Sequence, residues 1–163
     1  MRQLWAPWRM IYLKGENPRV EGCMFCEKFK GEDAVEHILY RGSGALVVLN
    51  RFPYNNGHMM VVPRQHTEHL DALDDVILLE MMQLVRHAIH ALREVYTPHG
   101  FNIGVNQGRA AGAGVAEHLH LHVVPRWTDD ANYMTVIGQT RVIPESLDDT
   151  YATFRPYFDA LKA

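Results

Sequence analysis

Three features are scarce in this sequence: cysteine, positive charge and long apolar runs. Only 2 cysteines among 163 residues exclude a disulfide-dense scaffold. Lys and Arg number 16 against 19 Asp and Glu, a net charge of −3, so the basic surface typical of nucleic-acid-binding proteins is absent. No apolar run approaches the roughly 18 residues that span a bilayer, and residues 1–9 lack the apolar stretch of a secretory signal. We therefore expect a cytoplasmic protein that binds neither nucleic acid nor membrane.

The remaining composition is ordinary for one folded domain. Hydrophobic residues make up 47% and charged residues 21%, which is typical of globular proteins. A length of 163 residues is also typical of one domain. We expect a single domain over 1–163, with an N-terminal arm at 1–22, a core at 23–127 and a C-terminal extension at 128–163.

Hydrophobic periodicity predicts five short strands and two helices. From Leu73 to Val95 the apolar residues recur every three or four positions, which indicates a long amphipathic helix. A second such helix is expected over 146–161. The expected strands are His37–Arg41, Ala45–Leu49, Gly57–Val62, Phe101–Asn106 and Leu119–Val124. Hairpin-joined strands with one inserted helix predict an α+β fold, with a mostly antiparallel five-stranded sheet, one long helix and a C-terminal helix.

The densest chemistry lies in the last predicted strand, His118-Leu119-His120-Leu121-His122. Alternate residues of a strand share a face, so the three imidazoles should line one side and the leucines the other. At roughly 3.3 Å per residue, His118 and His122 start about 13 Å apart, whereas zinc needs each nitrogen within about 2.1 Å. A division of labour among the histidines is therefore expected. The plain alternative is a polar face of solvated histidines.

A loop rich in small residues, Gly108–Gly114, precedes the histidines. Small side chains let a ligand approach the backbone closely, and consecutive exposed N–H groups bind phosphate. An imidazole beside a phosphate is suited to nucleophilic attack or to general acid catalysis. The alternative interpretation of the loop is a flexible connector.

The two cysteines form one Cys-x-x-Cys motif, Cys23 to Cys26. Such a motif is half of a metal site or a redox pair. No strand–helix–strand pattern surrounds it, which disfavours the redox interpretation. The other two ligands of a tetrahedral zinc site would be distant histidines.

His-Leu-His-Leu-His-Val-Val resembles the signature of the histidine-triad (HIT) superfamily. The resemblance extends from the Cys-x-x-Cys motif to Trp127 and includes 49–53, Gly57-His58 and 62–66. It implies a nucleotidyl hydrolase or transferase that acts at an α-phosphate. The wider context, including 5–10, is closest to the bacterial branch that phosphorolyses or hydrolyses diadenosine tetraphosphate.

The resemblance also implies the catalytic residues. His120 would attack phosphorus and carry the nucleotidyl group as a covalent intermediate. His122 and His118 would flank it, with His122 at the phosphate oxygens. His58, from a neighbouring strand, would support the nucleophile by fixing the orientation of a neighbouring ring.

Two further positions match substrate-binding positions of the family, and two others lie where the sequence departs from it. Asn50 would bind the ribose hydroxyls, and Gln107 the phosphate or the leaving group. Better-known hydrolases carry a Gln, Ser or Thr between the loop and the triad, which this sequence lacks. We expect the backbone N–H groups of Gly114 and Val115 to replace those side chains.

The adenine nucleotide that the resemblance implies as substrate needs an apolar slot, and Leu49 and Phe52 are candidates to build it. Mg²⁺ is a possible companion of the polyphosphate. The family also tends to form homodimers, by extending the sheet or pairing the long helices.

Zinc-binding relatives imply a ligand set for the Cys-x-x-Cys motif. The matching residues are Cys23, Cys26, His66 and His118, and the zinc would be structural. His69 or His37 are alternatives to His66.

Other functions stay open at this stage. They are a nucleoside phosphoramidate hydrolase, a non-catalytic nucleotide-binding module, and a zinc hydrolase with His118 and His120 as catalytic ligands. The sequence does not decide between hydrolysis and phosphorolysis.

Overall fold

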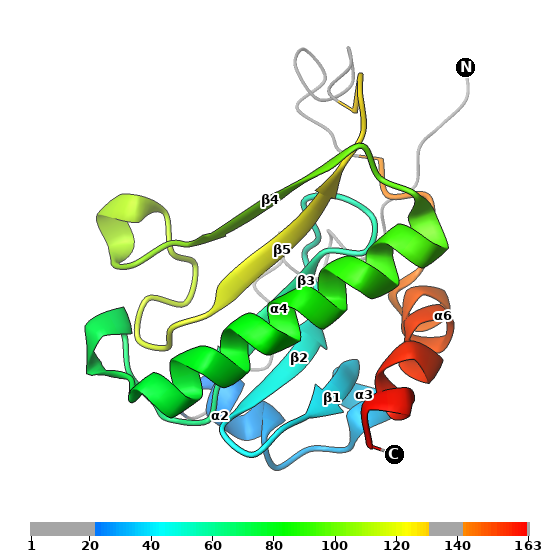
Figure 1. Cartoon of the computed structure of the whole chain (residues 1–163). Coiled ribbons are helices and arrows are strands. Elements are labelled where there is room, and N and C mark those ends of the chain that lie inside the picture. Colours follow the sequence, from blue (N-terminus) through cyan, green and yellow to red (C-terminus); the bar gives the residue numbers. More distant parts are fainter. Residues whose placement is uncertain (1–21, 131–141, 163) are drawn as a thin grey trace.

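The computed structural model describes residues 22–130 and 142–162. Its centre is an antiparallel sheet of five strands in the order β1-β2-β3-β5-β4 (Figure 1). The strands are β1 (Ile38–Arg41), β2 (Ala45–Leu49), β3 (Met59–Pro63), β4 (Gly100–Val105) and β5 (Leu121–Arg126). This arrangement confirms the predicted fold class.

One long helix and several short ones surround the sheet. The helices are α2 (Met24–Lys28), α3 (Asp33–Glu36), α4 (Asp75–Tyr96) and α6 (Leu147–Asp159), with short 3₁₀ turns at Leu70–Ala72, Arg109–Ala111 and Ala160–Lys162. The long helix begins two residues after the predicted start and ends at Tyr96, where Thr97 adopts a left-handed conformation. None of the described helices is long and apolar enough to cross a membrane.

The two faces of the sheet bury different clusters. Helices α4 and α6 cover one face, and the main core lies between them and the sheet (Figure 1). A smaller cluster on the other face includes Phe25 of α2 together with Val48 and Met60. Because strand side chains alternate, Val47 and Leu49 face the main core whereas Val48 faces α2. The face that α2 covers is the one that receives the histidines.

Strand β5 begins two residues later than predicted. The N–H of Leu119 bonds to the carbonyl of Thr67 at 2.7 Å, and β3 pairs with β5 only from Leu121 onward. His118 and His120 therefore precede the strand, while His122 lies within it. The two residues before Leu121 are therefore outside the sheet, and the periodicity of the sequence does not predict where pairing begins.

The C-terminal helix is part of the main core. Phe154 and Phe158 of α6 are fully buried in it, and Ser146 caps the helix by accepting a hydrogen bond from the N–H of Asp149 at 3.1 Å. Residues 147–159 thus pack into the same core as the strands of 23–127. The predicted N-terminal arm lies outside the described residues, apart from Gly22.

Candidate active site and metal centre

The three histidines of the triad are buried, although histidine is a polar residue. His118, His120 and His122 are 0%, 6% and 8% exposed. Leu119 and Leu121 between them belong to the main core on the opposite side. The predicted alternation is therefore correct, even though part of the segment precedes the strand. Buried imidazoles need hydrogen-bond partners, and those partners define the state of each ring.

His120 is held in one tautomer by the backbone. Its Nδ1 lies 2.9 Å from the carbonyl oxygen of His118. A carbonyl only accepts hydrogen bonds, so Nδ1 carries the proton and Nε2 keeps its lone pair. Phe25 of α2 packs against the ring, with centroids 5.0 Å apart. The imidazole is thus oriented with a nucleophilic nitrogen away from its backbone contact.

His122 is held in the opposite tautomer by His58. The Nδ1 of His58 accepts from the N–H of Tyr54 at 3.1 Å and from the side-chain amide of Asn50 at 3.2 Å. The proton of His58 is therefore on Nε2, which donates to Nδ1 of His122 at 2.9 Å. His122 must then carry its proton on Nε2. That nitrogen is buried and has no protein partner in the part of the chain that the structure describes, so it is a ready donor to a phosphate oxygen.

Burial keeps the triad neutral. Desolvation lowers the pKa of His122 to about 4, with repulsion from His120 as the second cause. Desolvation also lowers the pKa of His120, partly opposed by its backbone hydrogen bond. A neutral imidazole is the nucleophilic form. At pH 7 the site therefore offers a lone pair at His120 and an N–H at His122.

The predicted metal ligands converge. The donor atoms of Cys23, Cys26, His66 and His118 all lie within 4.8 Å of one another. The Nδ1 of His118 is 3.2 Å from Sγ of Cys23 and 3.6 Å from Sγ of Cys26, and Nδ1 of His66 is 3.3 Å from Sγ of Cys26. Such separations suit a tetrahedral ion with ligand bonds of about 2.0–2.3 Å.

The chemistry of the donors also fits a metal ion. The Nε2 of His118 donates to the carbonyl of Pro63 at 2.8 Å, so the lone pair of Nδ1 faces the cluster. Of the alternative ligands, His37 pairs with Asp148 and His69 with Glu68. His120 is not among the four grouped residues. The set of two thiolates and two imidazoles is typical of a structural zinc site.

The loop before the triad lies on the same face as the triad. Val115 packs against the cluster that contains Phe25, and Gly108 and Gly112 adopt positive φ angles of 82° and 87°. Gln107 accepts a hydrogen bond from the N–H of Leu70 at 3.0 Å, and Gly114 is exposed. Val115 is thus the residue of this segment that packs on the triad face, and the role of the loop backbone stays a prediction.

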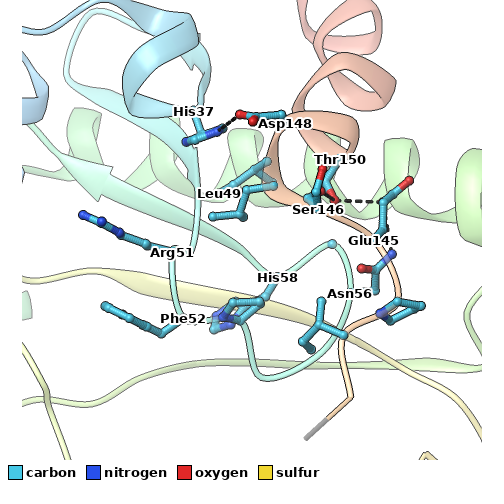
Figure 2. Close-up of a pocket in the computed structure, with 15 residues that line it drawn as sticks. His37, Leu49, Arg51, Phe52, Asn56, His58, Glu145, Ser146, Asp148 and Thr150 are labelled. Carbon is cyan, nitrogen blue, oxygen red and sulfur yellow. Dashed lines mark hydrogen bonds and ion pairs between the residues drawn. The ribbon is translucent and has the colours of Figure 1, made fainter. Parts of the chain in front are cut away.

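Leu49 and Phe52 line a cavity of about 490 Å³ at the end of the sheet (Figure 2). Its other walls are the loop between β2 and β3 and the start of α6. The side chain of Leu49 faces the main core, on the side opposite the triad. His58 lines the cavity as well, and it is the residue that connects the cavity to the triad.

Sequence reasoning missed several residues of this region. Phe25 lies between the two cysteines and contacts both His118 and His120. Tyr54 stacks on His122, with centroids 5.7 Å apart. Glu145, which precedes α6, lines the cavity. Nothing in the motif pattern marks these residues, because each becomes relevant through a contact across the fold.

The sheet and the site together define a class: an α+β domain with a five-stranded antiparallel sheet, a buried histidine triad and a cluster of two cysteines and two histidines. The chain belongs to the HIT domain family, whose model matches residues 32–129.

Three relatives show how close the match is. An AP-4-A phosphorylase of Mycobacterium tuberculosis is 42% identical over an alignment of 157 residues, and the match covers 92% of this chain and 80% of that protein. An uncharacterized HIT-like protein of Methanocaldococcus jannaschii is 34% identical, over 66% of this chain and 81% of its own. A Zn-bound histidine triad family protein from Mycobacterium smegmatis superposes with a TM-score of 0.69 at 30% identity, covering 86% of this chain and 96% of its own.

Proposed function

We propose that this enzyme cleaves dinucleoside polyphosphates of the diadenosine tetraphosphate type at the α-phosphate, through a covalent nucleotidyl intermediate on His120. The observation that carries the proposal is the hydrogen bond from Nδ1 of His120 to the carbonyl of His118, because it leaves Nε2 as the nucleophile. The AP-4-A phosphorylase relative, 42% identical, supports the choice of substrate.

The reaction has two displacements. The Nε2 lone pair of His120 forms a bond to the α-phosphorus, and the bond from that phosphorus to the bridging oxygen breaks, releasing ATP from diadenosine tetraphosphate. The N–H of His122 donates to a phosphate oxygen and stabilises the charge that develops. Inorganic phosphate or water then attacks the AMP carried by His120. Phosphate yields ADP, and water yields AMP.

Residues around the triad hold the reacting nucleotide. Asn50 is next to the triad through His58, and its amide reaches the ribose hydroxyls of the nucleotide. The N–H groups of Gly114 and Val115 contact the phosphates, and Gln107 the leaving polyphosphate. His58 is a positioning residue, since it acts on the reacting groups through His122. Mg²⁺ arrives with the polyphosphate.

Zinc held by Cys23, Cys26, His66 and His118 has a structural role in this proposal. The four residues come from α2, from the segment after β3 and from the segment before β5. A metal ion there supplies bonds that fasten α2 to the backbone carrying the nucleophile. A reducing cytoplasm would keep both cysteines as free thiols, and metal binding would deprotonate them to thiolates.

The enzyme is a homodimer in this proposal. Among the described strands, β4 is at the edge of the sheet and pairs only with β5, and its Ile103 is 45% exposed. Helix α4 exposes Val76, Leu79 and Met82 on one side. An edge strand and an apolar helix side are two surfaces that a second copy would cover.

A product assay tests the proposed function. Purified enzyme is incubated with diadenosine tetraphosphate, with and without inorganic phosphate, and the nucleotides are separated. ATP and ADP formed only with phosphate indicate a phosphorylase, and ATP and AMP formed in both cases indicate a hydrolase. His120→Asn should abolish either activity and the covalent adduct. Absence of turnover by the unmodified enzyme would refute the proposal and redirect attention to nucleoside phosphoramidates.

A further inference from the structure

The cavity between the β2–β3 loop and the start of α6 has chemistry that the triad mechanism does not use. Its volume of about 490 Å³ is in the range of small-molecule sites. The apolar walls are Leu49, Phe52, Pro53, Ile143, Pro144 and Leu147. Figure 2 shows Glu145, Ser146 and Thr150 along one side of this space, with His58 and Phe52 opposite them.

Glu145 is a fixed carboxylate in that cavity. Its Oε2 accepts hydrogen bonds from the hydroxyl of Tyr96, from Thr150 Oγ1 at 2.8 Å and from Asn56 Nδ2 at 3.1 Å. Burial and the neighbouring carboxylate raise the pKa of Tyr96 well above its ordinary range, so the phenol stays a donor. Three donors on one oxygen anchor the side chain, and its other oxygen accepts no hydrogen bond from the residues that the structure describes.

The charges that line the cavity select against a simple anion. Glu145 and Asp148 are both acidic, and His37 already pairs with Asp148 at 2.7 Å. A ligand with hydrogen-bond donors on a flat apolar body satisfies both the carboxylate and the apolar walls. A nucleoside has this character, because its base is flat and its hydroxyl and amino groups are donors.

One residue that lines the cavity is also hydrogen-bonded to the triad. His58 lines the cavity and also donates to His122 of the triad. Arg51 also lines the cavity. It supplies the positive charge that a polyphosphate reaching from the triad to the cavity requires. A dinucleoside polyphosphate carries one nucleoside at the triad and a second at the far end of its phosphates.

We infer that this cavity binds the second, distal nucleoside of the dinucleoside polyphosphate, with Glu145 accepting hydrogen bonds from it. The inference rests on the proposed function, since it assigns a place to the half of that substrate that is released. Glu145 is thereby a specificity-determining residue for dinucleoside over mononucleoside substrates.

Glu145→Gln tests the inference with two substrates. The amide can keep its oxygen toward Tyr96, Thr150 and Asn56, and it then presents an N–H₂ donor to the cavity in place of an acceptor. The KM for diadenosine tetraphosphate should rise by about tenfold, the effect of losing a hydrogen bond to a charged group. The KM for adenosine 5′-tetraphosphate, which lacks the second nucleoside, should not change.

Two further variants keep the result decisive. Glu94→Gln is the matched control, because Glu94 is exposed on α4 and does not line the cavity; both KM values should stay as in the unmodified enzyme. Ile143→Trp fills the cavity without altering Glu145, and it should reproduce the selective rise even if Glu145→Gln fails to fold.

The outcomes separate the inference from the proposed function. The inference would be overturned if the variants raised the KM for both substrates equally, or if Ile143→Trp changed neither KM. Either result would leave the proposed function intact. Absence of turnover of both substrates by the unmodified enzyme would refute the proposed function instead.

Discussion

Each triad histidine has a different hydrogen-bond partner, and the partner decides what the ring can do. The carbonyl of Pro63 turns the Nδ1 lone pair of His118 toward the metal cluster. The carbonyl of His118 accepts a hydrogen bond from Nδ1 of His120, so the proton stays on Nδ1 and the lone pair is on Nε2. His58 forces the proton of His122 onto Nε2. Three identical side chains are thus held in three different states, which suit the roles proposed for them: metal ligand, nucleophile and hydrogen-bond donor.

Asn50 has two contacts in the structure that the sequence did not predict. Its amide donates to His58 at 3.2 Å, and its carbonyl oxygen accepts from the N–H of Phe52 at 2.9 Å. A role at the ribose hydroxyls was inferred from the family pattern and remains a proposal. The structure adds that Asn50 also helps to fix the tautomer of His58.

The depressed pKa of His122 predicts how stability depends on pH. The folded ring titrates at about 4 and the ordinary value is 6.5, so between these values the unfolded chain binds a proton that the folded protein does not. The contribution of this ring to stability is present above pH 6.5 and is lost as the pH falls toward about 4. We expect a loss on the order of 2 kcal/mol.

Urea unfolding at several pH values measures that loss. The difference in unfolding free energy between the unmodified protein and His122→Asn should be constant above pH 7 and should shrink between pH 6.5 and 4.5. Parallel curves for the two proteins across this window would show that His122 is not the titrating group.

At the scale of elements, α2 is joined to the triad by Phe25 and by the cluster of Cys23, Cys26, His66 and His118. Helix α2 has only five residues, too short to be stable by itself. Phe25 anchors it against His118 and His120, and Cys23 and Cys26 place their sulfurs beside His118. A bound ion would therefore stabilise both the helix and the segment that carries the nucleophile.

Removal of the metal should destabilise the protein. We expect about one zinc per chain by elemental analysis, and a chelator should lower the Tm by roughly 10 °C, which corresponds to about 4 kcal/mol of binding energy. Cys23→Ser should lower zinc content and Tm together. His69→Ala is the control, because His69 is exposed and pairs with Glu68; loss of zinc in that variant would refute the proposed ligand set.

At the scale of the whole molecule, two exposed surfaces are the candidate contacts of the proposed homodimer. They are the edge strand β4 and the side of α4 that carries Leu79, which is 61% exposed. We expect a dimer by light scattering, and Leu79→Lys should shift it toward the monomer at micromolar concentration. The exposed substitution Glu94→Lys, also on α4, should leave the dimer intact. A monomeric unmodified protein would contradict the proposed homodimer.

The fold was predictable because its signals are local. The apolar spacing of α4 and the alternation around His120 are periodicities of neighbouring residues, and they place the elements within a few residues. The first residues of β5 were predicted incorrectly because Leu119 bonds to Thr67, a contact that no local pattern encodes. The C-terminal helix was also predicted from its local spacing, and the structure adds that Phe154 of α6 packs into the main core.

The features of the site can likewise be divided into those that the sequence determines and those that depend on the tertiary structure. The sequence by itself determined the residue types and their spacing: three histidines at every second position, a pair of cysteines and a glycine-rich loop. Only the tertiary structure decided which nitrogen of each ring is protonated, how closely the four predicted metal-ligating side chains approach one another, and where a cavity with an anchored Glu145 lies. These depend on distances between residues far apart in the chain, such as the 2.9 Å from His58 to His122, and packing of the whole domain sets such distances.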